Sequence, residues 1–307
     1  MKKFITQILL FSLVPISVMI ITSYYFADGY IDTYYKRFTS SKQEHLILGT
    51  SRAAQGIVPS VLNKYFQKQF YNYSFTISHS PFGKGYFESI KKKLDPHTKN
   101  GIFIIAVDPF SITSHLKPNG DENFDHEKMI TNQKMVNTNP NFEYIFKNHL
   151  TPWRLLFNHK KKNKNNITYL HDDGWLEVDY PWTAEKYAIN LESKIKDYRK
   201  NQMKRVVSKV RIHYLEETIQ FLKQHGTVYL VRIPTAKEMF DIENELVPNF
   251  NTYINEISIK NKVLYFNCSE DYNIYQTTDG NHLYKPYAYK FTEALCDSIL
   301  MKQKIIF

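Results

Sequence analysis

Two apolar stretches decide the fold: residues 101–107 read GIFIIAV, and residues 226–233 read GTVYLVRI. Each stretch is nearly continuous in apolar residues and does not alternate between apolar and polar positions. Each is closed by a proline, Pro109 after Asp108 in the first case and Pro234 in the second. Strands of this kind are buried on both faces, which is typical of a parallel sheet covered by helices on both sides.

Shorter strands and amphipathic helices alternate around these two stretches. We predict further strands at residues 46–48, 70–75 and 262–267, and helices at residues 59–67, 80–94, 211–224, 236–246 and 287–302. This alternation predicts one α/β domain over residues 44–307, with a three-layer, doubly wound, flavodoxin-like parallel sheet.

Residues 110–200 interrupt the alternation of strands and helices. They contain asparagine-rich and basic loops, among them residues 159–164 (HKKKNK), and the tryptophans Trp153, Trp175 and Trp182. We interpret them as an insertion over the carboxyl edge of the sheet that leads into a long helix at residues 184–199. The lysine run is interpreted as a solvated loop.

The first residues indicate the compartment. Lys2 and Lys3 precede residues 4–26, which carry no charge and exceed the roughly 20 residues that cross a hydrocarbon core. Tyr24, Tyr25 and Phe26 would form an aromatic belt at the far interface. We predict a single-pass anchor (residues 1–27) in a bacterial cytoplasmic membrane, a short helical stalk (28–43) and an extracytoplasmic or periplasmic domain. A cleaved signal peptide is the alternative, although no A-x-A site follows the apolar stretch.

The charge balance restricts the partners. Forty Lys and Arg residues against thirty Asp and Glu give a net charge of +10. Such a balance suits nucleic acid, an anionic membrane surface or an acidic glycan. Because the anchor places the domain outside the cytoplasm, we expect no nucleic-acid partner and a surface that faces a membrane or a glycan. An aromatic content of 15% excludes a disordered chain.

The cysteines and histidines indicate neither a disulfide framework nor a metal. The chain has two cysteines, Cys268 and Cys296, and two buried free thiols are favoured over a disulfide. Residues 171–173 (HDD) could ligate a metal, but no second pair of ligands has a suitable spacing. We therefore expect no metal and no cofactor.

Two short motifs combine into a candidate catalytic site. Residues 48–52 (LGTSR) follow the first predicted strand, and residues 278–282 (TDGNH) precede the last predicted helix. In a doubly wound sheet, both would lie beyond the carboxyl ends of the strands. Ser51 would be the nucleophile, His282 the general base, and Asp279 the carboxylate that orients the imidazole.

Four other residues are candidates for binding substrate or the oxyanion. Arg52 follows the nucleophile directly. Asp108 comes at the end of the predicted strand 101–107, and Arg232 near the end of the predicted strand 226–233. For Arg52 and Arg232, a structural ion pair is an equal alternative, and for Asp108 the alternative is a capped turn. The backbone of Ser78 is a candidate oxyanion donor beside the Ser51 N–H.

The two motifs resemble those of the SGNH (GDSL-type) hydrolase superfamily, over roughly residues 44–109 and 226–301. More narrowly, the chain resembles the membrane-anchored bacterial branch that includes alginate-type O-acetylation proteins and the accessory protein of teichoic acid D-alanylation. That resemblance implies an esterase or O-acyltransferase that transfers an acyl group, acetyl in the first place, to or from a cell-surface glycan or acylated polymer. A membrane-bound O-acyltransferase would be the protein partner.

Three positions depart from the family pattern. Thr50 stands where the first block usually has Asp, residues 72–79 lack the glycine of the second block, and the third-block Gly-x-Asn is absent. These departures leave open an alternative function, in which the domain is a catalytically inactive scaffold or a glycan-binding partner of the acyltransferase.

Overall fold

The computed structural model describes residues 1–25, 29–30, 32–124, 133–148, 167–179 and 181–306. Three of the features named above, Phe26, Trp153 and the lysine run at residues 159–164, lie outside the described residues.

A five-stranded parallel sheet forms the centre of the domain. Its strands are β1 (His45–Leu48), β2 (Phe70–Asn72), β3 (Gly101–Ala106), β9 (Gly226–Arg232) and β10 (Leu264–Asn267). Their order across the sheet is β10-β9-β3-β1-β2, and every neighbouring pair is parallel. The predicted α/β class and parallel sheet are thus confirmed. The chain runs outward in opposite directions from β1 and β3, which creates a switch point between these two strands.

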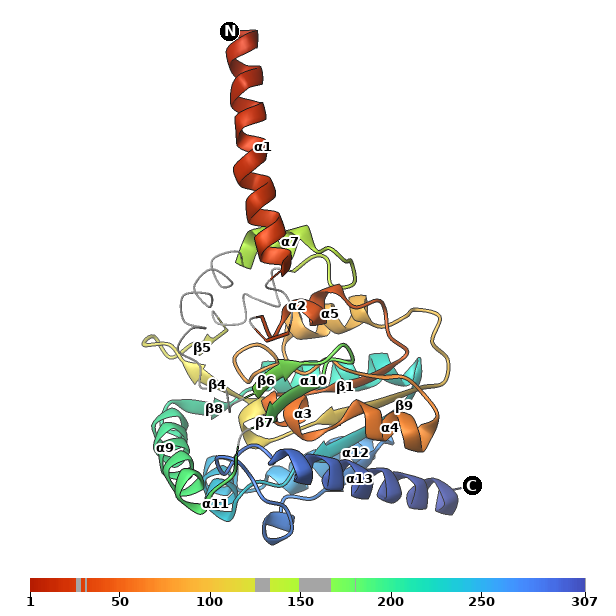
Figure 1. Cartoon of the computed structure of the whole chain (residues 1–307). Coiled ribbons are helices and arrows are strands. Elements are labelled where there is room, and N and C mark those ends of the chain that lie inside the picture. Colours follow the sequence, from red (N-terminus) through yellow and green to blue (C-terminus); the bar gives the residue numbers. More distant parts are fainter. Residues whose placement is uncertain (26–28, 31, 125–132, 149–166, 180, 307) are drawn as a thin grey trace.

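Helices cover both faces of the sheet (Figure 1). One face packs against α5 (Lys84–Lys93), α10 (Lys209–Lys223) and α12 (Phe250–Asn261), and the other against α3 (Ser51–Gly56), α4 (Pro59–Phe66) and α13 (Lys285–Ile306). Successive strand residues point to opposite layers, so Ile105 belongs to the first core cluster and Ile104 to the second. Both residues are fully buried, which explains why the strands are apolar throughout.

Some element boundaries differ from the prediction. Strand β2 ends at Asn72, and α5 begins at Lys84 and not at residue 80. Helix α12 was not predicted, although Phe250, Ile254 and Ile257 follow helical spacing and are buried. Its polar, asparagine-rich sequence conceals this stripe.

The insertion contributes small antiparallel sheets and the predicted long helix. Strands β4 (Thr113–Leu116), β5 (Glu122–Asn123) and β8 (Arg205–Val207) form one sheet, and β6 (Ile167–Leu170) pairs with β7 (Leu176–Asp179) in another. The same part of the chain contains η1 (Pro109–Ile112), α7 (Phe142–Asn148) and α9 (Ala184–Gln202). Two further elements, α11 (Lys237–Leu246) and η3 (Asp271–Asn273), follow later in the chain. Helix α9 packs against α11, and this packing places α9 next to the helix that follows the carboxyl end of β9.

Helix α1 (Lys2–Tyr25) projects from the domain as a single helix (Figure 1). Residues Lys2–Ile21 are long and apolar enough to cross a membrane, with a hydropathy of 2.4 and none of the stretch buried. A signal sequence near an N-terminus meets the same criteria.

The segment after α1 packs on the domain, so the predicted stalk is wrong for its described part. Helix α2 (Tyr35–Thr39) places Tyr35 and Phe38 in the core, with exposures of 3% and 0%. Asp32 is also buried, and its carboxylate accepts hydrogen bonds from the Tyr144 hydroxyl at 3.0 and 2.9 Å. The aromatic residues of this segment are therefore core residues.

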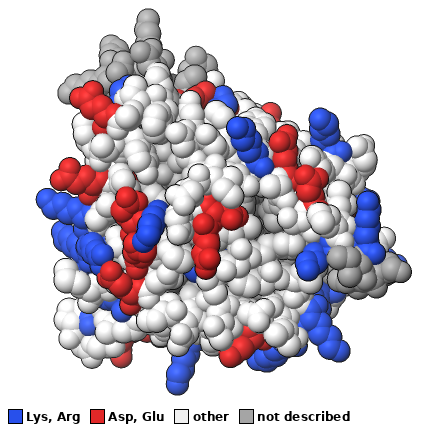
Figure 2. All heavy atoms as spheres, turned by 90° about the horizontal axis from the view of Figure 1, so that it is seen from below, with Lys and Arg blue, Asp and Glu red and all other residues white. Residues whose placement is uncertain are grey.

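Charged side chains of both signs are scattered over the face opposite α1. Figure 2 shows Lys and Arg side chains interspersed with Asp and Glu side chains on this face. Although the chain has a net charge of +10, this face is therefore not uniformly positive.

Candidate active site

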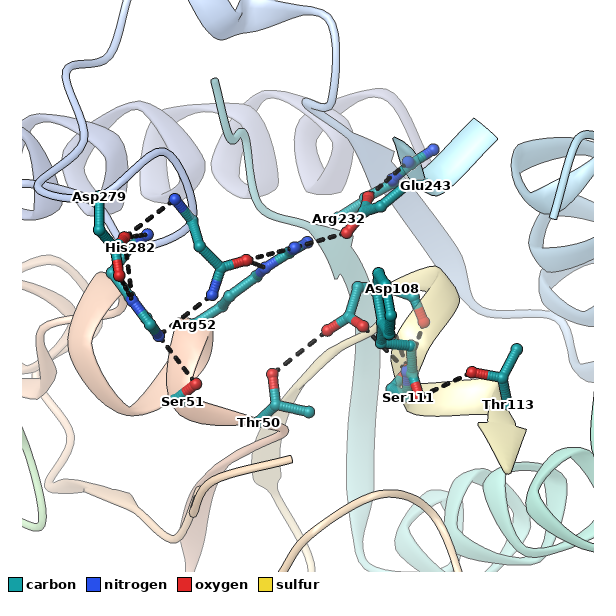
Figure 3. Close-up of polar contacts among 12 residues, drawn as sticks. Thr50, Ser51, Arg52, Asp108, Ser111, Thr113, Arg232, Glu243, Asp279 and His282 are labelled. Atoms are coloured by element: carbon teal, nitrogen blue, oxygen red, sulfur yellow. Dashed lines mark hydrogen bonds and ion pairs between the residues drawn. The ribbon is translucent and has the colours of Figure 1, made fainter. Parts of the chain in front are cut away.

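Ser51, His282 and Asp279 form a continuous hydrogen-bonded chain (Figure 3). Ser51 Oγ lies 2.9 Å from His282 Nε2, and His282 Nδ1 lies 2.9 Å from Asp279 Oδ2. Ser51 is the first residue of α3, directly beyond β1, and the other two belong to the loop before α13. This is the arrangement of a nucleophile, a general base and an orienting carboxylate.

The turn after β1 requires a glycine. Gly49 has φ +145°, and a Cβ added there would lie 3.0 Å from Ala106 Cβ, Ala106 O and Ala53 Cβ. Next to it, Thr50 Oγ1 donates to Asp108 Oδ2 at 3.2 Å, which joins the ends of β1 and β3. Ser51 is consequently held at the switch point of the sheet, where open α/β sheets bind their ligands.

The Asp-x-x-His spacing forms a turn that fixes both side chains. Asp279 Oδ1 accepts hydrogen bonds from the backbone N–H groups of Asn281 and His282 at 3.0 and 2.9 Å. The backbone N–H of Thr278 donates to the carbonyl of His282 at 2.9 Å and closes the turn. The carboxylate is thereby held against the imidazole and keeps Nδ1 protonated.

A lysine of the insertion also contacts this carboxylate. Lys194 Nζ, on α9, lies 3.0 Å from Asp279 Oδ2. Burial by itself would raise the pKa of Asp279, but the charges and hydrogen bonds of His282 and Lys194 outweigh it and hold this pKa far below its usual range. Asp279 therefore stays ionised. The sequence predicts the helix but cannot show that Lys194, among its many lysines, faces the site.

Arg52 is buried, and two of its three guanidinium nitrogens contact protein partners. Its Nε and Nη2 donate to Asn281 Oδ1 at 2.9 and 2.5 Å, and Nη2 lies 2.5 Å from Glu243 Oε1. Burial lowers the pKa of Arg52, but the charges of Glu243 and Asp108 more than compensate and raise it overall. The structural ion pair predicted as one alternative is thus present.

Arg232 is likewise part of a buried ion pair. Its side chain is 1% exposed, and Nη2 lies 2.8 Å from Glu243 Oε2. The rings of Phe250 and Phe240 flank its guanidinium, with centroids at 4.9 and 5.3 Å. Burial would raise the pKa of Glu243, but Arg52 and Arg232 outweigh it and lower this pKa. Arg232 therefore has the structural role and no opening to substrate.

Asp108 caps the turn after β3. Its Oδ1 accepts from the Ser111 N–H at 2.9 Å, while its own N–H donates to Ser111 Oγ at 3.0 Å. Burial raises the pKa of Asp108, and the nearby Arg52 charge counteracts this only in part. Of the two alternatives for Asp108, the structure contains the capped turn.

Ser78, the other predicted oxyanion donor, lies in the loop between β2 and α5. It is exposed, in the turn at residues 77–79. In the described part of the chain, no hydrogen bond joins it to Ser51, Asp279 or His282. The neighbouring His79 contacts Thr76 Oγ1 at 2.6 Å through Nδ1. The role of the Ser78 backbone as an oxyanion donor stays a prediction.

A cavity of about 500 Å³ lies beside the loop that carries Asp279 and His282. Thr277 of this loop forms part of its wall, and Trp182 Nε1 donates to the Thr277 carbonyl at 3.1 Å. Five aromatic residues line it: Trp182, Tyr187, Tyr272, Tyr275 and Tyr287. Only Trp182 among them was singled out in the sequence.

Among the described residues, no group of three or more His, Cys, Asp or Glu side chains is placed to hold a metal ion. His171 Nε2 contacts Glu177 Oε2 at 2.6 Å, and Asp172 pairs with Lys36 at 2.8 Å. Cys268 and Cys296 are both free thiols.

Comparison with known proteins does not assign the chain to a family: no family model and no curated protein matches it. Fold and site together define an α/β protein with a Ser-His-Asp arrangement at the carboxyl edge of a parallel sheet.

Proposed function

We propose that the chain is a membrane-anchored, SGNH-like serine esterase or O-acyltransferase with Ser51 as its nucleophile. The observation that carries this proposal is the 2.9 Å contact between Ser51 Oγ and His282 Nε2, continued by the 2.9 Å contact between His282 Nδ1 and Asp279. An imidazole oriented in this way can accept the serine proton.

The reaction would have two halves. The Ser51 Oγ proton moves to His282 Nε2 while Oγ bonds to the ester carbonyl carbon, whose π electron pair moves onto the carbonyl oxygen. When this pair returns, the bond to the leaving alcohol breaks, and the alcohol oxygen takes the proton from Nε2. Water or a sugar hydroxyl then attacks the acyl-enzyme by the same proton transfers, which gives hydrolysis or transfer.

Topology supports the SGNH-like assignment. Counted along the chain, the sheet strands have the order 2-1-3-4-5. Ser51 follows the first strand, and the Asp-x-x-His turn precedes the last helix. The missing family glycine and Gly-x-Asn do not change these positions.

The surroundings of the site support a cell-surface glycan or acylated polymer as substrate. Aromatic faces with polar edges suit the alternating apolar and hydroxyl surfaces of sugar rings, and the cavity that Thr277 lines offers five such residues. Helix α1, which is long and apolar enough to cross a membrane, supports a single-pass anchor. The bacterial cytoplasmic membrane and the extracytoplasmic position of the domain are part of the proposal by resemblance and by the position of Lys2 and Lys3. By resemblance, acetyl is the acyl group and a membrane-bound O-acyltransferase is the partner.

The proposal is tested with the full chain in detergent micelles and p-nitrophenyl acetate. We expect release of nitrophenol, reduced to the uncatalysed rate by Ser51→Ala. Ser298→Ala is the matched control, because Ser298 is exposed on α13 and bonds only within its own helix. Equal rates for the wild type and Ser51→Ala would contradict catalysis and favour the non-catalytic scaffold.

A further inference from the structure

Asn281 lies between the two catalytic residues of its loop and is buried, with 2% exposure. Its Nδ2 lies 3.2 Å from His282 Nε2, the nitrogen that also contacts Ser51 Oγ at 2.9 Å. The amide nitrogen therefore contacts the same imidazole nitrogen as the nucleophile, next to the position where a substrate carbonyl would be attacked.

Arg52 determines which end of this amide faces the reaction centre. Its Nε and Nη2 both contact Asn281 Oδ1, at 2.9 and 2.5 Å. A guanidinium has donors only, so the atom that it binds must be the acceptor oxygen. If the amide were flipped, its NH₂ group would face the two guanidinium donors without an acceptor. The unflipped amide is therefore the stable one, and its Nδ2 is directed toward His282.

Arg52 is itself fixed by a buried relay of charges. Glu243 pairs with Arg52 through Oε1 at 2.5 Å and with Arg232 through Oε2 at 2.8 Å. Because burying three charged groups gives little net stability, such a network is better explained by the orientation that it imposes. Arg52, one residue after the nucleophile, thus acts as a positioning residue for Asn281.

The resting contacts change when the serine reacts. Because Nδ1 faces the Asp279 carboxylate, Nε2 is the nitrogen with the lone pair, and Ser51 Oγ and Asn281 Nδ2 both lie within donor distance of it, at 2.9 and 3.2 Å. Once Nε2 takes the serine proton, it becomes a donor and can no longer accept from Asn281. The amide hydrogen loses its acceptor at the moment when a negative oxygen forms on the carbon bonded to Oγ.

We propose that Asn281 Nδ2 donates to this oxyanion and is the side-chain member of the oxyanion hole. The proposal rests on the proposed function. Asn281 would be the donor that the missing Gly-x-Asn leaves unassigned. It belongs to a different loop, and Arg52 orients its amide. Preorganised donors of this kind are worth about 10²–10³ in turnover.

Asn281→Asp is the sharpest variant. An aspartate keeps the acceptor oxygen for Arg52, so the buried relay persists, but it has no amide hydrogen to donate. Asn281→Ala removes both contacts. Asn267→Asp is the matched control, because Asn267 Oδ1 accepts from Ser269 at the end of β10 and can be replaced by a carboxylate oxygen.

The measurement is the steady-state rate of p-nitrophenyl acetate hydrolysis by the full chain in detergent. Each variant is measured at a pH on the plateau of its own pH–rate profile, and its melting temperature is recorded to check that it is folded. We expect Asn281→Ala and Asn281→Asp to lower kcat by roughly 10²–10³ with KM within about threefold, because only the transition state uses the donor. Asn267→Asp should stay within about twofold of wild type.

A folded Asn281→Asp variant with kcat within threefold of wild type would overturn this proposal and leave the proposed function intact. A purely structural role would lower the melting temperature of Asn281→Asp and kcat together, and that result would also overturn it. Absence of Ser51-dependent hydrolysis in the wild type would reject the proposed function and, with it, the role of Asn281.

Discussion

Lys194 Nζ lies 3.0 Å from Asp279 Oδ2, the same carboxylate oxygen that His282 Nδ1 contacts at 2.9 Å. A cation from the insertion therefore shares the carboxylate that would stabilise the imidazolium during catalysis. Through Lys194, the insertion therefore changes the electrostatic environment of Asp279.

Replacing this lysine should shift the pH dependence of the reaction. In Lys194→Met, the carboxylate attracts a proton on the imidazole more strongly, so the acidic limb of the kcat/KM profile moves to higher pH. Partly exposed ion pairs are worth about 0.2–1 kcal/mol, which corresponds to roughly 0.2–0.7 of a pH unit. Lys196→Met, on the exposed side of the same helix, is the control. Superimposable acidic limbs for wild type and Lys194→Met would contradict this electrostatic coupling.

Glu243 should be far more important for stability than its neighbour Glu245. Glu243→Gln removes the carboxylate that pairs with both Arg52 and Arg232, which leaves buried Arg232 without its ion-pair partner and Arg52 with only the more distant charge of Asp108. Breaking a buried pair in this way costs about 3–5 kcal/mol. Glu245 pairs with Arg199 on the surface, so Glu245→Gln should leave the urea midpoint nearly unchanged. Equal midpoints for the two variants in urea unfolding would show that the buried relay is not formed.

Gly49 should tolerate no side chain. Gly49→Ala combines a positive φ with contacts of 3.0 Å to Ala106 and Ala53, so we expect a loss of about 1–3 kcal/mol and a displaced Ser51. Gly120→Ala is the matched control, because Gly120 also has a positive φ, of +88°, but has no atom within 4 Å of an added Cβ. Gly120→Ala should keep full esterase activity. Full activity in Gly49→Ala would contradict the steric argument.

Lys93 should make stability depend on pH. Burial lowers the pKa of Lys93 to about 7 from its ordinary 10.5. Between these values the unfolded state binds the proton and the folded state does not, so Lys93 makes unfolding less favourable as pH rises from 7 to 10.5. The slope is at most about 1.4 kcal/mol per pH unit. Between pH 7.5 and pH 9.5, the free energy of unfolding in urea should increase more for the wild type than for Lys93→Met. An equal change in the two chains would contradict this dependence on Lys93.

Much of the sheet is predictable because its signal is local. The continuous apolar runs that became β3 and β9 need no knowledge of the rest of the chain, since burial on both faces demands them. The loops that hold Ser51 and His282 were predicted to meet from topology alone, and the two side chains lie 2.9 Å apart.

What the sequence could not predict depends on packing between distant segments. Asn281 looks like any residue of a turn until Arg52, 229 positions away, is seen to orient it. Lys194 is one of many lysines on a polar helix, and only the docking of α9 selects it. Residues 32–43 resemble a polar stalk because only two of their aromatic residues, Tyr35 and Phe38, are buried, too few to form a recognisable apolar pattern.

The central claim is that Ser51 is an activated nucleophile, and labelling by a serine-directed p-nitrophenyl phosphonate tests it most directly. The full chain in detergent is treated with the reagent, and mass spectrometry of its peptides locates the adduct. We predict an adduct on Ser51 in the wild type, which His282→Ala abolishes and Ser298→Ala leaves unchanged. A wild-type chain with no adduct on Ser51, or one labelled equally in His282→Ala, would contradict the account.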